Sequence, residues 1–136
     1  MKILATLFVT VMMISSSLMT NKQSITVTVT NASGDNGKVS FAIYDEANFM
    51  RQPLQSKEGK IVDGKSTVTF ENIAPGEYAI LCYHDKNDND RMDFESNGMP
   101  MEDFGATNNV MNFGPPRYQD AKFTVTDKDL TFEIKF

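Results

Sequence analysis

The chain has few of the residues on which many small domains depend. Its 136 residues include one cysteine, Cys82, one histidine, His84, and no tryptophan. A single cysteine excludes a disulfide within the chain, and one histidine without a second cysteine provides no paired zinc motif. No Ser/His/Asp set and no glycine-rich phosphate loop is recognisable. The sequence therefore predicts a domain that depends on its hydrophobic core, and we expect no enzymatic activity.

Basic residues are outnumbered as well. Lys and Arg total 13 against 18 Asp and Glu, which gives a net charge of −5. A protein that binds nucleic acid or an anionic membrane surface usually carries a basic patch or stripe, and none is present. We therefore expect no nucleic-acid partner.

No apolar run reaches the roughly 20 residues that a membrane-spanning helix needs. Near the N-terminus, Lys2 precedes an uncharged apolar run at residues 3–14, and three serines follow at 15–17. This order of charge, apolar run and small residues is typical of a secretory signal peptide. We expect a signal peptide over approximately residues 1–20, a secreted or periplasmic protein, and no transmembrane span after cleavage. Residues 24–136 then form one domain, which is long enough to bury a hydrophobic core without disulfides or a structural metal.

Apolar and polar residues alternate through most of that domain. Ile25, Val27 and Val29, for example, alternate with threonines. A period of two is typical of a strand with one buried and one solvated face. The expected strands are residues 25–30, 39–44, 57–62, 67–71, 78–83, 123–126 and 130–136. The pattern predicts an all-β fold, a single antiparallel β-sandwich of about seven strands.

Turn residues separate the expected strands. Asn36-Gly37 and Asp63-Gly64 both suit turns that need positive φ. Asp127 and Asp129 indicate a final hairpin between the last two strands.

Residues 84–117 do not follow the strand pattern. They are rich in Asn, Asp, Gly, Pro and Met, and an insertion of this length is either functional or disordered. Phe94, Phe104, Phe113 and Pro115-Pro116 provide apolar anchors. We therefore expect one long ordered loop packed on the sandwich, and the functional residues within it.

The acidic start of this loop has the spacing of a calcium site. Calcium prefers six to eight hard oxygen ligands, and a loop with oxygen side chains at positions 1, 3, 5 and 9 can surround it. The expected ligands are Asp85, Asn87, Asn89, Asp93 and the backbone carbonyl of Arg91, with Glu95 able to add a carboxylate.

The spacing departs from that of an EF-hand. Asp90 stands where glycine is usual at position 6, Ser96 replaces the glutamate at position 12, and no helical pattern flanks the loop. A plain acidic turn without metal is the alternative.

Three residue types near the loop each have a structural and a functional interpretation. His84 is interpreted as a strand-end histidine paired with a nearby carboxylate, and alternatively as a catalytic base with Asp85. Cys82 is interpreted as a small buried hydrophobe, and alternatively as a reactive thiol. The loop methionines fill gaps, or alternatively bind copper together with His84. These methionines are Met92, Met99, Met101 and Met111.

The chain resembles the bacterial domain-of-unknown-function family numbered 2141. The resemblance covers about residues 25–136, and its specific part is the long loop. The matching motifs are Ile73-Ala74-Pro75-Gly76-Glu77-Tyr78-Ala79, His84-Asp85, Asn87-Asp88-Asn89, Gly98-Met99-Pro100, Glu102, Phe104-Gly105, Asn108-Asn109, Phe113-Gly114-Pro115-Pro116 and Asp120-Ala121. The resemblance implies an exported immunoglobulin-like or prealbumin-like sandwich and no particular activity. Where such sequences carry Gly after the Asn residues, this one has Asp88 and Asp90.

These observations predict an exported, non-catalytic binding or structural module. Calcium would order the acidic loop, and the loop would meet an extracellular or periplasmic protein, peptide or glycan. The alternatives are a prealbumin-like hydrolase that uses His84 with Asp85, and a periplasmic copper-binding protein that uses the loop methionines.

Overall fold

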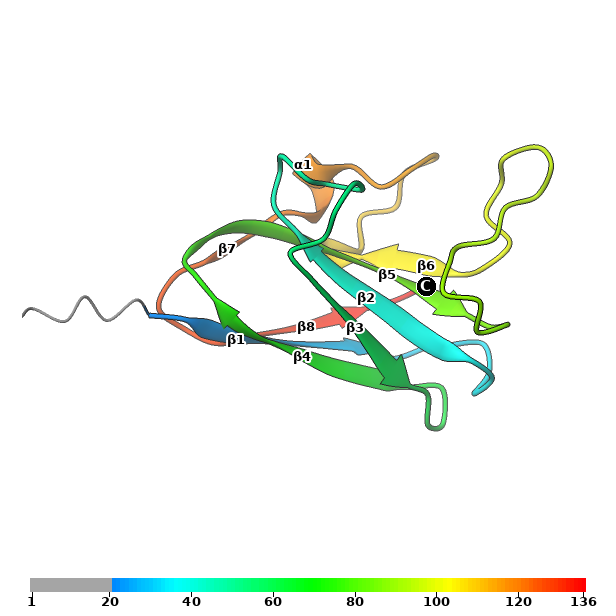
Figure 1. Ribbon diagram of the computed structural model, residues 1–136, viewed down its shortest axis with the longest axis horizontal. Coiled ribbons are helices and arrows are strands. Elements are labelled where there is room, and N and C mark those ends of the chain that lie inside the picture. The colour runs from blue at the N-terminus through cyan, green and yellow to red at the C-terminus, as the bar shows by residue number, and fades with distance from the viewer. Residues whose placement is uncertain (1–20) are drawn as a thin grey trace, which may run out of the picture.

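The computed structural model describes residues 21–136, so the expected signal peptide lies outside the described residues. Two β-sheets pack face to face (Figure 1). The first has the order β4 (Ser66–Ile73), β1 (Gln23–Val29), β8 (Leu130–Ile134). The second has the order β3 (Gln55–Lys60), β2 (Lys38–Tyr44), β5 (Gly76–Asp85), β6 (Phe104–Ala106), and β7 (Phe123–Val125) also pairs with β5. The predicted all-β sandwich is confirmed, and β6 adds an eighth strand inside the long loop.

Two pairings differ from the prediction. β1 and β8 run parallel, with Val27 opposite Phe132, so the sandwich is not antiparallel throughout. The predicted last hairpin is wrong, because β7 pairs with β5 whereas β8 pairs with β1 in the other sheet. Asp127 and Asp129 lie where the chain crosses between sheets, and Asp129 Oδ1 accepts a hydrogen bond from Ser24 N at 2.8 Å. The period of two identifies a strand but not its partner.

The core lies between the two sheets, and the expected inward positions fill it. The buried cluster includes Ile25, Val27 and Val29 from β1 and Val39, Phe41 and Ile43 from β2. Burying one such side chain is worth roughly 1.5–3 kcal/mol, so this interface is the main source of stability.

Glycine and aspartate take the backbone conformations that the turns require. Gly37 has a φ of 72°, and Asp63 and Gly64 have φ values of 52° and 75°. Two backbone hydrogen bonds, of 2.9 and 3.0 Å between Val62 and Lys65, close the second turn. The predicted turn chemistry at both positions is confirmed.

The long loop is ordered and attached to the sandwich at several points. It contains β6 and the 3-10 turn η1 (Thr107–Asn109), and it ends at the short helix α1 (Tyr118–Ala121). The Thr107 hydroxyl is buried and accepts a hydrogen bond from Ile80 N at 3.2 Å. The Asn109 side chain bonds Glu133 O and Lys135 N, both at 2.9 Å. These contacts hold the loop against both sheets.

The outer face of the second sheet is covered only at its ends. Along β5 every second residue faces outward, and among these Ala79 packs under α1. Leu81 and Tyr83 follow and are only partly covered. The last, Asp85, is buried beneath the acidic loop. The middle of this face therefore remains open.

Within residues 21–136, no helix is long and apolar enough to cross a membrane.

Candidate functional site: an acidic loop beside an apolar groove

Two buried carboxylates hold the acidic loop. Asp85 is 0% exposed, and its two oxygens accept hydrogen bonds from Asn89 N at 3.1 Å and Asp90 N at 2.8 Å. Glu102 is 6% exposed and accepts bonds from Lys86 N at 3.1 Å and Asp93 N at 3.3 Å. Buried backbone N–H groups need acceptors, and this irregular segment obtains them from side chains.

Three of the expected calcium ligands converge. Asn87 Nδ2 donates to Asp93 Oδ2 at 2.7 Å, and Asn89 Nδ2 lies 2.9 Å from both Asp93 oxygens. The hydrogen bonds from Asn89 and Asn87 lower the pKa of the Asp93 carboxyl group. Asp85 joins this group through the backbone N–H of Asn89.

The other two expected ligands lie at its margin. Arg91 N donates to Asn89 Oδ1 at 3.2 Å, and the Arg91 Nε atom lies 3.7 Å from Asp93 Oδ1. Glu95 lies further on, in a small hairpin where its N–H bonds Met99 O at 2.8 Å.

A second set of acidic residues lies on the same loop, and its charge is balanced by Lys38, which the sequence analysis missed. Carboxylate oxygens of Asp85, Asp88 and Asp90 lie within 4.8 Å of one another. The Lys38 ammonium contacts Asp90, and it lies 3.0 Å from Asp88 and 2.8 Å from Glu58. Hydrogen bonds to these carboxylates raise the pKa of Lys38, and the bond from Lys38 lowers the pKa of Asp90. Lys38 is distant in sequence, and only the pairing of β2 with β5 brings it here.

The loop adopts positive φ at two aspartates, although it lacks the glycine that an EF-hand has at position 6. Asp88 and Asp90 have φ values of 56° and 63°. Aspartate and asparagine tolerate this left-handed conformation better than most residues. Asp90 thus takes the position where an EF-hand has glycine.

His84 does not have the predicted partner. Its Nε2 atom lies 2.7 Å from the backbone carbonyl oxygen of Asn36, not from a carboxylate. The ring is 1% exposed and stacks on Phe136, with ring centres 6.4 Å apart. Successive residues on a strand point to opposite faces, so His84 faces the core whereas Asp85 faces the loop. The geometry does not assemble the pair that the hydrolase alternative requires.

Cys82 is the buried hydrophobe that the sequence predicts. It lies in the core, and burial raises the pKa of its thiol. The methionines of the copper alternative are divided, because Met92 and Met99 line a groove that neither Met111 nor His84 lines.

That groove lies on the outer face of the second sheet and has a volume of about 960 Å³. The open middle of the second sheet forms its floor. Ser40, Ala42 and Tyr44 of β2 contribute to it, with Leu81 and Tyr83 of β5. Ser40 and Ala42 are small, so the floor is low at its centre. Burial raises the pKa of the Tyr44 and Tyr83 phenols, which therefore remain neutral.

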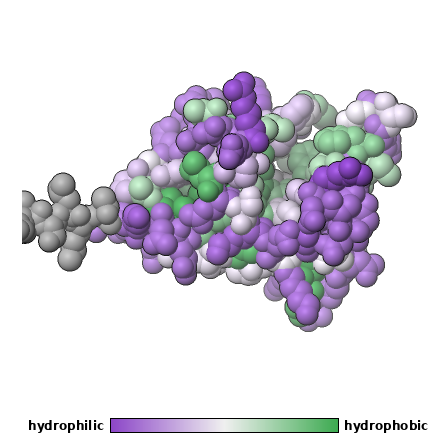
Figure 2. Space-filling view, in the orientation of Figure 1, coloured by the Kyte–Doolittle hydropathy of each residue, from purple (hydrophilic) through white to green (hydrophobic). Residues whose placement is uncertain are grey.

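Three loops form the walls, and Figure 2 shows apolar side chains gathered around a hollow. The β2–β3 loop contributes Met50 and Pro53. The hairpin after the acidic loop and the segment before α1 form the other walls. Their apolar residues are Met92, Phe94, Met99, Pro100, Phe113, Pro115 and Pro116. Apolar side chains gathered around a hollow make this groove a candidate binding site. Sequence analysis located the loop but missed the floor, for which the small residues Ser40 and Ala42 were the available indication.

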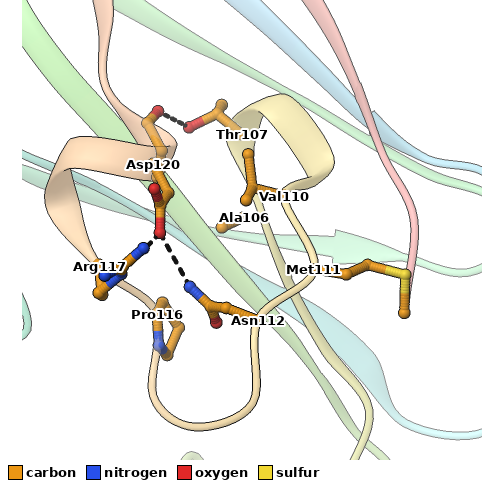
Figure 3. Close-up of a pocket in the computed structure, with 9 residues that line it drawn as sticks. Ala106, Thr107, Val110, Met111, Asn112, Pro116, Arg117 and Asp120 are labelled. Carbon is orange, nitrogen blue, oxygen red and sulfur yellow. Dashed lines mark hydrogen bonds and ion pairs between the residues drawn. The ribbon is translucent and has the colours of Figure 1, made fainter.

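An ion pair holds the wall segment before α1 (Figure 3). Arg117 Nε and Asn112 Nδ2 both donate to Asp120 Oδ2, at 2.8 and 2.9 Å. The bond from Arg117 is the main reason that the pKa of Asp120 is lowered. A separate depression of about 110 Å³ lies beside this pair, with Met111 on its edge.

Residues 27–133 match the model of a family described as "Uncharacterized protein conserved in bacteria (DUF2141)". Comparison with curated proteins finds no match. Among solved structures, a cysteine-to-alanine mutant of the pilus-presented adhesin Spy0125 (Cpa) is similar, with 15% identity and a TM-score of 0.31 over 88% of this chain and 28% of the adhesin. Another crystal form of that adhesin gives 17% identity and a TM-score of 0.30 over 87% of this chain and 27% of the adhesin. The chain thus spans less than a third of the adhesin, and so weak a likeness supports no functional inference.

Proposed function

The chain belongs to the bacterial DUF2141 family, and from this premise we propose that it is an exported, non-catalytic binding module whose ligand occupies the apolar groove. The proposal depends on one observation, the groove of about 960 Å³ between the long loop and the outer face of the second sheet. Ligand pockets typically measure 300–1,000 Å³ and are lined mainly by apolar and aromatic side chains. A rigid sheet with a loop above it is a common arrangement for binding.

Calcium has a supporting role in this proposal. Asn87, Asn89 and Asp93 already converge, and an asparagine amide turned by half a rotation presents its oxygen where its nitrogen was. With Asp85, these groups offer the hard oxygens that calcium prefers. The ion would offset carboxylate repulsion and stabilise the hairpin that forms one wall of the groove.

Binding is tested with N-phenylnaphthylamine, a neutral dye that fluoresces in apolar surroundings. The protein should bind it saturably, and Ala42→Phe, which fills the floor, should weaken binding about tenfold or more, or about 1.4 kcal/mol. Thr67→Phe is the matched control, since Thr67 is an exposed strand residue in the other sheet. Equal dye binding by the Ala42→Phe and Thr67→Phe variants would contradict the proposal.

Calcium is tested separately by thermal unfolding. For a site with a Kd of about 0.1–1 mM, roughly 10 mM calcium should stabilise the fold by about 1.4–2.7 kcal/mol. Asp93→Asn should remove most of this effect, whereas Asp129→Asn, the same charge change outside the loop, should retain it. An unchanged melting temperature in calcium would exclude the ion and leave the groove proposal intact.

A further inference from the structure

One end of the groove floor is polar. Residues that lie opposite one another on neighbouring strands form rows across the outer face of the second sheet. In the row beside the acidic loop, Ser40 lies opposite Glu58 on β3 and opposite Tyr83 on β5. All three residues line the groove. This row offers one carboxylate and two hydroxyls, and each of these groups can accept a hydrogen bond from a polar head group.

The middle of the floor is apolar. Ala42 and Leu81 face each other in the next outward row, which lies about 7 Å further along the strands. The walls add flexible thioether side chains, which adapt their shape to irregular apolar partners. These side chains are Met50, Met92 and Met99. The floor therefore matches a ligand that has a polar head at one end and an apolar chain behind it.

The pairing of the floor strands disfavours a peptide as the occupant. β2 is paired on both sides, by β3 and β5, and β5 is paired by β2 and β6 along Leu81–Tyr83. The floor has no free backbone groups with which to pair an added strand. A peptide lying there would bury N–H and C=O groups with few partners, which is costly.

The charge at the polar end is negative. Carboxylates of Glu58, Asp88 and Asp90 contact the Lys38 ammonium, and three carboxylates against one ammonium leave a formal charge of −2. The side chains of Glu58 and Asp90 are 58% and 71% exposed, whereas that of Lys38 is 16% exposed. The carboxylates therefore remain accessible to a ligand. An ammonium head would meet complementary charge there, and an anionic head would meet like charge.

The other lysines of β3 do not change this balance. Lys57 lies opposite Phe41, which faces the core, so its side chain lies on the other face of the strand. Lys60 and Asp85 lie on either side of Lys38 in the row beyond, and their formal charges cancel.

We propose that the groove binds one free single-chain amphiphile with a primary ammonium head, a long-chain amine. The head lies between Glu58 and Asp90, where its three N–H donors meet the carboxylates and the Tyr83 hydroxyl. The chain lies over Ala42 and Leu81. This inference rests on the proposed binding function and specifies its ligand.

The test uses the protein labelled with ¹³C in its methionine methyl groups, titrated at pH 7 with dodecylamine below its micelle concentration. The NMR signals of Met50, Met92 and Met99 should shift and saturate together. Met111, which is 98% exposed and lies outside the groove, should not shift. Dodecanoic acid has a carboxylate head on a chain of the same length, and it should bind about tenfold or more weakly.

A pair of double variants locates the head. Glu58→Gln with Asp90→Asn removes two carboxylates from the polar end, and asparagine tolerates the positive φ at position 90. The preference for dodecylamine over dodecanoic acid should fall to about twofold or less, because the remaining charges there cancel. Glu71→Gln with Glu133→Gln makes the same charge change at exposed strand positions of the first sheet and should keep the preference.

Any other outcome overturns the amine assignment. These outcomes are no saturable shift, an equal shift at Met111, equal binding of dodecanoic acid, a preference that survives the Glu58/Asp90 change, or an equal loss of preference in the control variant. Shifts caused by a basic peptide but not by the amine would assign the groove to a polypeptide. If N-phenylnaphthylamine binds and dodecylamine does not displace it, the binding module stands and only its ligand is wrong. If neither compound reaches the groove methionines, both proposals fail.

Discussion

Replacement of Asp85 should distinguish a loop held by a buried carboxylate from a loop that is merely acidic. Asp85 is completely buried, and its oxygens accept two backbone hydrogen bonds of 3.1 and 2.8 Å. Hydrogen bonds to charged groups contribute about 1.5–3 kcal/mol each. Asp85→Ala removes both acceptors, and we expect it to cost about 3–6 kcal/mol, a large part of the 5–15 kcal/mol typical of a domain.

Two further variants give this prediction its controls. Asp88→Ala changes an exposed neighbour whose ion pair is with Lys38, and exposed pairs contribute about 0–1 kcal/mol. Asp85→Asn keeps the shape of the side chain and one acceptor oxygen, so its loss of unfolding free energy should lie between those of Asp88→Ala and Asp85→Ala.

The assay is urea unfolding followed by circular dichroism, combined with hydrogen exchange at the amides of Asn89 and Asp90. If Asp85→Ala only detaches the loop, urea unfolding shows a loss no larger than the stability that the docked loop contributes. Faster hydrogen exchange at the Asn89 and Asp90 amides then reveals the local detachment. The reasoning is refuted if Asp85→Ala matches Asp88→Ala within about 0.5 kcal/mol and both amides remain protected.

Three other predictions follow from the structure. Gly37→Ala should cost about 3 kcal/mol or more in urea unfolding, because φ is 72° and the new Cβ would lie 1.9 Å from a carbonyl oxygen of β5. Gly98→Ala should cost only about 1–2 kcal/mol, because φ is 85° but no atom lies within 4 Å of the new Cβ. Equal costs for the two variants would contradict the idea that the close approach of β5 to Gly37 matters. Iodoacetamide should alkylate Cys82 only through unfolding, since burial keeps the thiol pKa high; labelling as fast as that of the denatured chain would show the thiol to be accessible. The pKa of Asp120 is lower in the folded protein than its ordinary value of 3.8, so the ion pair stabilises the fold at pH values above 3.8, and this stability is lost as the pH falls through the folded pKa. Asp120→Asn and Arg117→Gln should therefore both reduce the loss of unfolding free energy at acid pH. An unchanged loss would show that the pair contributes nothing.

Local patterns determined most of the sandwich. Alternation identified five strands and their buried faces, because one side of a pleated strand must be apolar when it covers a core. A more continuous apolar run identified the strand at residues 78–83, and residues 57–62 were a weaker edge candidate. Asn36-Gly37 and Asp63-Gly64 marked their turns because few residues adopt positive φ at low cost. The Asp and Asn spacing of the acidic loop predicted a calcium site, and its members Asn87, Asn89 and Asp93 are joined by hydrogen bonds, whereas calcium binding itself stays a prediction.

The tertiary structure decided what lies beside what. Strand partners are set by packing between segments far apart in sequence, so the parallel pair of β1 and β8 and the crossover after β7 had no local indication. For the same reason, the sequence did not reveal that Lys38 balances the loop carboxylates or that His84 faces the core. The groove exists only because the long loop folds over Ser40 and Ala42, and the small size of these two residues gains its meaning only when the walls close around them.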